Sequence, residues 1–161
     1  MNVVLRSLKI MKIDPLKSPK ANLADLIYHS NFIRLYENQF EVIHVLPSDL
    51  ETFNTRVKIK GIEAFKLTGK KEFFYNRIML NQLVDTPIEY ALTEQSNKES
   101  IVMALSVQLG IDHDHLELIG FPPTESVSES SLYTLKAKDD SLLYCGTLMV
   151  TLICWIKDHE N

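Results

Sequence analysis

Four consecutive residues alternate between carboxylates and imidazoles: Asp112, His113, Asp114 and His115. If this stretch is extended, His113 and His115 project from the same face and Glu117 joins them, because side chains of a strand alternate with a period of two. Three such ligands can hold a zinc ion and leave one coordination position open. The spacing therefore raises the hypothesis of a metal-dependent enzyme that uses His113, His115 and Glu117.

The same stretch also suits a connecting loop. Asp112 can cap a helical turn or close an Asx-turn, which leaves both histidines facing solvent. A shift of 76 residues places the stretch 36–39, "YENQ", opposite it, and this equivalent contains no histidine. What the two stretches share is length and polarity, which is what a loop between apolar anchors requires. We therefore expect no metal, no cofactor and no catalytic residue here.

A second group of side chains could bind a charged partner. Its members are basic, and the aromatic residues Phe73, Phe74 and Tyr75 lie among them. Basic and aromatic side chains on a sheet can bind single-stranded nucleic acid, so a nucleic-acid-binding module is an alternative function. The sequence pI of 5.7 argues against it and favours docking on an acidic protein surface. This predicted basic interaction face consists of Arg56, Lys58, Lys60, Lys70 and Lys71.

Other chemistry finds no support in the sequence. The chain has only five glycines, and it contains no G-x-x-x-x-G-K-S/T, G-x-G-x-x-G or G-x-S-x-G stretch. No apolar run approaches the ~20 residues that a membrane span needs, so we expect no membrane partner. The opening stretch "MNVVLRSLKIMKI" is interrupted by Arg6, Lys9 and Lys12, which argues against a secretory signal and suits a flexible or partner-docked arm.

The net charge of −4 conceals two halves of opposite sign. Residues 1–80 contain 13 Lys and Arg against 8 Asp and Glu, a balance of +5, whereas residues 81–161 contain 4 against 13, a balance of −9. Halves of opposite sign attract each other within one molecule or head to tail between copies.

A helix is predicted at the start of each half. Ser18 followed by Pro19 is a capping hydroxyl and then a proline at the first helical position. In the second half, Ser96 and Glu99 have the spacing of a capping box, and Gly110 is placed to end the helix in a left-handed conformation. The apolar stripes are Leu23, Leu26 and Ile27 in the first helix and Ile101, Val102, Leu105 and Leu109 in the second.

A short strand and a hairpin are predicted after each helix. The short strands are residues 40–45 and 116–119, and "TRVKIKG" alternates with the period of a half-buried strand. The final arm, "GTLMVTLICWI", is apolar on both faces, which is typical of a strand buried on both sides.

We therefore predict an α+β fold with two tandem helix–strand–β-hairpin repeats and an N-terminal arm. A repeat of about 60 residues buries little surface alone, so each repeat must pack on the other repeat or on other chains. The predicted boundaries are the arm at 1–17, the first α+β repeat at 18–80, a linker at 81–95 and the second α+β repeat at 96–157.

The hairpins carry a family resemblance. Leu135-Lys136-Ala137-Lys138 followed by residues 141–146, "SLLYCG", matches it best, and "NTRVKIKG" with Tyr75-Asn76-Arg77 matches less closely. Over roughly residues 20–156 the chain resembles a small α+β repeat domain of unknown function that recurs in virion structural proteins of large-genome tailed bacteriophages.

The resemblance implies a non-enzymatic part of a phage particle, in the head, neck, tail or baseplate. It implies localisation in the virion, and in the host cytoplasm during assembly. The implied partners are other virion structural proteins, to which the split charge adds copies of the chain itself. The family supplies no catalytic residue and no cofactor to carry over.

Overall fold

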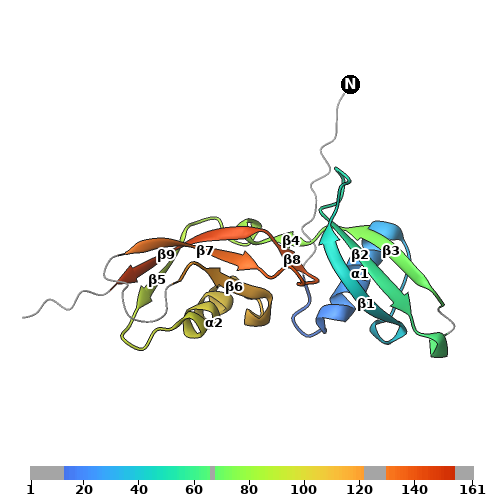
Figure 1. Cartoon of the computed structure of the whole chain (residues 1–161), viewed down its shortest axis with the longest axis horizontal. Helices are drawn as coiled ribbons and strands as arrows, with labels where there is room; N and C mark the ends of the chain where they lie inside the picture. Colours follow the sequence, from blue (N-terminus) through green and yellow to red (C-terminus); the bar gives the residue numbers. More distant parts are fainter. Residues whose placement is uncertain (1–12, 66–67, 122–129, 155–161) are drawn as a thin grey trace, which may run out of the picture. The chain divides into compact units, whose positions relative to one another are not determined.

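The computed structural model describes residues 13–65, 68–121 and 130–154 (Figure 1). The chain divides into two compact units, residues 1–78 (unit 1) and residues 79–161 (unit 2). Each unit contains one α-helix and a β-sheet, so the fold is mixed α+β. Within the described residues, no helix is long and apolar enough to cross a membrane.

Unit 1 is a three-stranded antiparallel sheet with a helix on one face (Figure 1). The strand order is β1-β2-β3, and the helix α1 contacts β3. Strand β4 (Ile78–Met79) lies at the boundary with unit 2. The elements of unit 1 before it are α1 (Pro19–Asn31), η1 (Glu37–Gln39), β1 (Phe40–Pro47), β2 (Thr55–Gly61), η2 (Glu63–Phe65) and β3 (Lys70–Tyr75).

Helix α1 begins as the sequence predicts. The Ser18 hydroxyl accepts a hydrogen bond from the backbone N–H of Ala21 at 3.0 Å, and Pro19 occupies the first helical position. The helix ends at Phe32, whose φ of 58° is left-handed. The predicted stripe of Leu23, Leu26 and Ile27 is buried.

The core of unit 1 lies between α1 and the inner face of the sheet. Val57 and Ile59 on β2 point into it, and their neighbours Phe73 and Tyr75 on β3 are also buried. Phe40 on β1 completes this side with no exposed surface. Each fully buried side chain of this size contributes about 1.5–3 kcal/mol.

Unit 2 is a four-stranded sheet with the order β5-β9-β7-β6, and helix α2 covers one face (Figure 1). Strand β5 runs parallel to β9, and the other neighbours are antiparallel. The elements are η3 (Leu80–Gln82), β5 (Ile88–Leu92), α2 (Lys98–Leu109), η4 (His113–His115), β6 (Leu116–Ile119), β7 (Ser131–Ala137), β8 (Tyr144–Cys145) and β9 (Thr147–Cys154). Residues 81–95, expected as a connection, therefore contain a strand of the sheet.

The start of α2 differs from the expectation by one residue. The N-cap is Asn97, whose side chain accepts from the backbone N–H of Ser100, while the Ser100 hydroxyl accepts from the backbone N–H of Asn97. Ser96 instead accepts a bond from the backbone N–H of Thr93 at 2.8 Å. The prediction of Ser96 and Glu99 as the capping box was wrong, because the next residue is an equally good cap with its own partner.

The end of α2 follows the sequence. Gly110 has a φ of 68°, as predicted for a glycine that ends a helix. All four residues of the predicted stripe are buried: Ile101, Val102, Leu105 and Leu109.

The last arm of the second hairpin is covered on one face only. Val150 and Leu152 on β9 are fully buried, but Met149, which precedes Val150 and points to the opposite face, keeps 46% of its surface exposed. Among the residues that the structure describes, the expectation of a strand buried on both sides is therefore not met. Gly146, the first residue of this arm, has a φ of 79° and separates β8 from β9.

Candidate interaction surface

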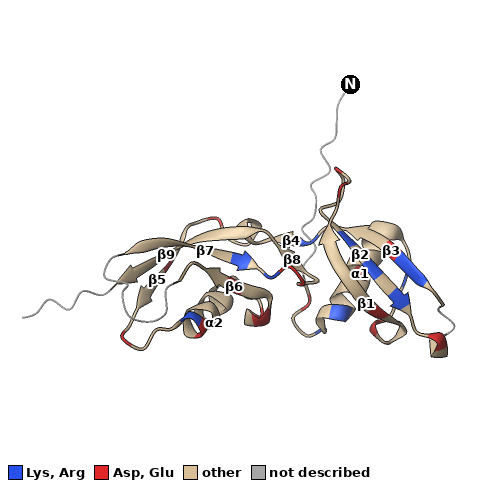
Figure 2. Cartoon of the chain, viewed as in Figure 1, with Lys and Arg blue, Asp and Glu red and all other residues tan. Residues whose placement is uncertain are grey.

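The register places most of the predicted basic residues on the outer face of the unit 1 sheet, opposite α1. Figure 2 shows Lys and Arg in blue along β2 and β3. Directly paired residues of neighbouring strands project from the same face of a sheet. The register therefore sets up three rows across β1, β2 and β3, which together form what we call the basic face. The rows are Glu41–Lys60–Lys70, His44–Lys58–Glu72 and Leu46–Arg56–Phe74.

Four of the five predicted residues lie in these rows, and Lys71 does not. Lys71 pairs with the buried Ile59, so its side chain starts from the core-facing side of the sheet. Its Nζ atom lies 5.6 Å from the centre of the Phe73 ring. The basic face is therefore smaller than the sequence suggested.

The basic face mixes charges of both signs. Its four cations face the carboxylates Glu41 and Glu72, a balance of +2, and the Lys58 Nζ atom lies 3.9 Å from Glu72 Oε1. An exposed pair of this kind contributes less than about 1 kcal/mol. Two of the three aromatic residues that suggested base stacking, Phe73 and Tyr75, are buried in the core, and Phe74 alone lies on the face, paired with Arg56. Two carboxylates and a single aromatic ring on the face favour a protein partner over nucleic acid.

On this face, the side chain of Arg56 has a buried hydrogen-bond donor without an acceptor in the described part of the chain. Its Nε atom is buried and has no hydrogen-bond partner among the described residues. It lies between Phe74 and the part-exposed Leu46. An unsatisfied buried donor costs about 1–3 kcal/mol. A partner that docks on this row and supplies an acceptor would recover that cost, and arginine is enriched at protein interfaces.

The stretch that suggested a metal site is not extended. Residues His113–His115 form the 3-10 helix η4, so the two histidines do not alternate as they would on a strand. Asp112 caps this turn by accepting a hydrogen bond from the backbone N–H of Asp114 at 3.0 Å, as the loop hypothesis predicts. Glu117, the third proposed ligand, lies on β6 and pairs with Lys136 at 3.4 Å.

His113 remains at the surface between two carboxylates. Its ring nitrogens lie 3.2 Å from Asp112 Oδ1 and 3.6 Å from Asp114 Oδ1. In the described ranges, these three exposed residues are the one group of three metal-ligating side chains that lie within 4.8 Å of one another. The structure therefore does not bring His113, His115 and Glu117 together as a site.

His115 points into the unit and makes contacts that the sequence did not reveal. Its Nδ1 atom lies 3.0 Å from the Ser141 hydroxyl oxygen, and its ring packs edge-on against Tyr144 at 5.3 Å between centres. Burial lowers the pKa of His115 below its ordinary value, against the opposing effect of Asp112 and Asp114. The expectation that both histidines face solvent holds for His113 alone.

The His115–Ser141 pair has a structural geometry. Ser141 is 4% exposed, and its hydroxyl oxygen also accepts from the backbone N–H of Tyr144 at 3.2 Å. A nucleophilic serine must be reachable by a substrate, and this one is enclosed. The contact therefore anchors the loop before β8 to the start of β6.

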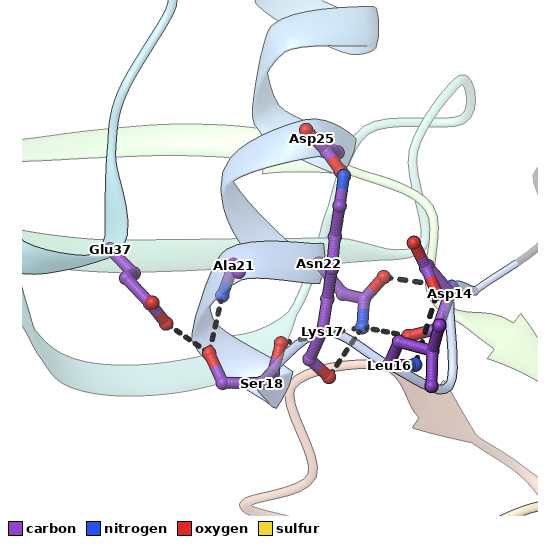
Figure 3. A network of polar contacts seen from close by, with 8 residues as sticks. All are labelled: Asp14, Leu16, Lys17, Ser18, Ala21, Asn22, Asp25 and Glu37. Carbon is purple, nitrogen blue, oxygen red and sulfur yellow. Dashed lines mark hydrogen bonds and ion pairs between the residues drawn. The ribbon is translucent and has the colours of Figure 1, made fainter.

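Unit 1 also has an open pocket of about 500 Å³ between α1 and the segment that leads to β1. Lys17 binds Asp25 at 2.6 Å at its edge, and the Ser18 hydroxyl contacts the Glu37 carboxylate (Figure 3). Elsewhere in the lining, the Arg34 guanidinium lies 5.0 Å from the centre of the Tyr28 ring. These polar groups bind each other, so the pocket's contacts hold α1 to η1.

A model of a family of unknown function, DUF7941, matches residues 14–154. The chain belongs to the DUF7941 family. No curated protein and no solved structure matches it. The DUF7941 match runs from before α1 to the end of β9, so it includes both units, the basic face and the His115 contact.

Proposed function

We propose that this DUF7941 chain is a non-enzymatic structural protein of a bacteriophage virion, in the head, neck, tail or baseplate. It acts through protein–protein contacts in a multi-copy assembly, and it uses no cofactor. Its partners are other virion structural proteins and copies of itself, in the virion and, during assembly, in the host cytoplasm. The resemblance of its hairpins to virion structural proteins of tailed phages supports this assignment.

The observation that carries the assembly role is the charge of the two units. Residues 1–78 hold 13 cations and 8 anions, or +5, and residues 79–161 hold 4 and 13, or −9. The change of sign falls at the boundary between the units. The basic face of one copy then meets the acidic unit 2 of the next, and such head-to-tail contacts close into rings or extend into tubes.

We infer further that the two units are copies of one helix–strand–hairpin repeat. Several backbone hydrogen bonds recur at nearly the same length after a shift of 76 or 77 residues. These are Gln39 N to Tyr36 O and His115 N to Asp112 O, Ile62 N to Gln39 O and Lys138 N to His115 O, Phe65 N to Ile62 O and Ser141 N to Lys138 O, and Gly61 N to Gly69 O and Ala137 N to Gly146 O.

The strand registers support the same inference. Phe40 pairs with Gly61 as Leu116 pairs with Ala137, which is a shift of 76 on both strands. On the other side of the hairpin, Val57 pairs with Phe73 as Tyr133 pairs with Val150, with one residue gained in the turn. In tandem-repeat proteins each repeat packs against the neighbouring repeat of the same chain. A repeat of this kind suits a protein that also packs against further copies of itself.

Sedimentation velocity of the full chain tests the assembly role. At about 20 mM salt we expect oligomers, because charges interact over about 20–30 Å there, and dissociation at about 0.5 M salt. The variant Lys58→Glu with Lys60→Glu changes the balance of the basic face from +2 to −2 and abolishes the low-salt oligomers. The control is Lys20→Glu on α1 with Lys98→Glu on α2. It changes the net charge of the chain by the same amount as the test variant, and the low-salt oligomers should persist. A chain that stays monomeric at low salt contradicts the proposal.

A further inference from the structure

Acidic side chains of unit 2 gather in two turns that contact each other. One turn holds η4, and the other follows β7 and leads to β8. The side chains of Asp112, Asp114 and Asp139 are 61%, 81% and 90% exposed, and the adjacent Asp140 is exposed as well. We call these four residues the acidic turns.

The two turns form one rigid group around His115. The backbone N–H of Lys138 in the second turn donates to the His115 carbonyl oxygen in the first at 2.9 Å. Burial lowers the pKa of His115, and Asp112, Asp114 and Asp140 oppose this effect, so carboxylates of both turns lie near the same imidazole. A surface that is already ordered loses less conformational entropy when a partner binds to it.

The negative charge of this group exceeds the cations beside it. Carboxylate oxygens of Asp112 and Asp114 lie within 4.8 Å of each other. The acidic turns and the neighbouring Glu117 supply five carboxylates against two lysines, Lys136 and Lys138, a balance of −3. Like charges this close repel each other, and a cation from a partner offsets that repulsion.

The basic face of unit 1 has the opposite charge, with a balance of +2. Lys58 and Lys60 project from the same side of β2, about 7 Å apart at the strand. In the neighbouring row, the buried Nε atom of Arg56 has no hydrogen-bond partner among the described residues. A carboxylate suits this donor, because arginine binds carboxylates through two parallel hydrogen bonds.

We propose that the acidic turns of one copy bind the basic face of the next copy, and that Arg56 binds one of their carboxylates. This inference rests on the proposed head-to-tail assembly, and it names the surface of unit 2 that makes the contact. The two surfaces belong to different units, so a bound copy still presents one of them to a further neighbour. Contacts of this heterologous kind close into rings or extend as open filaments.

Sedimentation velocity of the full chain at about 20 mM salt tests the contact, because exposed charges are weakly screened there. The test variant is Asp114→Lys with Asp140→Lys, which reverses two exposed charges and keeps the Asp112 cap of η4. The matched control is Asp85→Lys with Glu89→Lys, an equal change of charge at exposed positions elsewhere in unit 2. Circular dichroism and thermal unfolding check that each variant folds.

We expect self-association to weaken at least tenfold in the test variant and to persist in the control, because like charges then face each other across the contact. Oligomers that form equally well in the folded test variant overturn this inference and leave the head-to-tail assembly standing. An equal loss in the control overturns it as well, since net charge alone would then explain the effect. An unaltered chain that stays monomeric overturns both proposals.

A mixture of two variants gives a result that net charge cannot explain. The Lys58→Glu, Lys60→Glu variant keeps the acidic turns, and the Asp114→Lys, Asp140→Lys variant keeps the basic face. Each variant alone should be monomeric at about 20 mM salt, and their equimolar mixture should form complexes, because each surface then meets one of opposite charge. Two folded variants that stay monomeric when mixed overturn the inference.

The variant Arg56→Lys tests the role of Arg56 without changing the charge of the basic face. Lysine lacks the planar group that binds a carboxylate through two parallel hydrogen bonds. We expect the dissociation constant, measured by sedimentation velocity over a concentration series, to rise at least about threefold. Lys60→Arg, which also keeps the charge, should leave it within about twofold of the unaltered value. If Arg56→Lys associates as tightly as the unaltered chain, Arg56 does not bind a carboxylate of the acidic turns.

Discussion

The Nδ1 atom of His115 lies 3.0 Å from the hydroxyl oxygen of Ser141, 26 residues further along the chain. The backbone of His115 also accepts a hydrogen bond from Lys138 N at 2.9 Å. One residue of η4 thus holds the loop between β7 and β8 at two points. His113, two residues earlier, stays exposed. The alternating acids and histidines therefore separate into a surface turn and a structural anchor.

We expect the anchor to make stability depend on pH. Burial lowers the pKa of His115 from its ordinary value of 6.5, so the folded state favours the neutral ring. The stabilisation is complete above pH 6.5 and is lost as the pH falls below it, because the unfolded chain binds the proton more readily. Urea unfolding at pH 7 and pH 5 should show a smaller fall in the free energy of unfolding for His115→Gln than for the unaltered chain.

Glutamine is the informative substitution here, because the shift of 76 residues places Gln39 opposite His115. The control is His113→Gln, which changes an exposed imidazole and should keep the full pH dependence. If His113→Gln and His115→Gln have the same pH dependence, the assignment of His115 as the anchor is wrong.

Asn54 should be a second stabilising residue. Its Oδ1 atom accepts from Arg77 N at 2.8 Å and from the Thr55 hydroxyl at 2.6 Å, and its Nδ2 atom donates to Arg77 O at 2.8 Å. Because Thr55 and Arg77 are buried, Asn54→Ala should lower the free energy of unfolding by about 2–3 kcal/mol, measured in urea. The exposed Asn81→Ala should change it by less than about 0.5 kcal/mol. If Asn54→Ala and Asn81→Ala lower the free energy of unfolding by the same amount, Asn54 is not a stabilising residue of this kind.

Phe32 is expected to lower the stability of unit 1. It is the one non-glycine residue of the described ranges with a positive φ, 58°, and its side chain is 85% exposed. Helix α2 ends instead at a glycine, Gly110, with a φ of 68°. Phe32→Gly should raise the thermal stability, by about 0.5–1 kcal/mol, because glycine adopts this conformation without strain. Phe32→Ala keeps the strain and should give no such gain; a less stable Phe32→Gly variant would refute this reasoning.

Nucleic acid binding gives a separate test of the basic face. We expect single-stranded DNA to be retained no better by the unaltered chain than by Lys58→Glu with Lys60→Glu, at about 50 mM salt. Glu41 and Glu72 on the face would oppose phosphates, and a binding protein would lose affinity steeply with salt. Tight retention that falls with salt and disappears in the variant would favour the nucleic-acid alternative.

The sequence predicted the elements whose signals are local. The period of two in "TRVKIKG" marks β2 at Thr55–Gly61, and residues 116–119 are β6 as expected. The caps at Ser18 and Gly110 are also local, since each depends on one residue and its neighbours. The basic face followed from the same alternation, except for Lys71, which lies on the opposite side of β3.

The features that were missed depend on distant parts of the chain. Strand β5 is five residues long and gains its place by pairing with β9, about 60 residues away. The role of His115 depends on Ser141, and the exposure of Met149 depends on what covers β9. A 3-10 helix of three residues, such as η4, is too short to produce a periodic pattern of apolar residues in the sequence. A local sequence pattern predicts the conformation of the segment that contains it. The contacts named above join segments that are far apart in the sequence, so they depend on tertiary packing and no local pattern predicts them.

Mass spectrometry of purified phage particles, combined with electron microscopy, tests the central claim most directly. On our proposal a phage encodes this chain, and its particles are separated from free protein by density-gradient centrifugation. We predict that the chain copurifies with them in many copies per particle, at a constant ratio to the other structural proteins, and occupies a repeated position in the map. Its absence from intact particles, or its presence only in the soluble fraction of infected cells, would contradict the account.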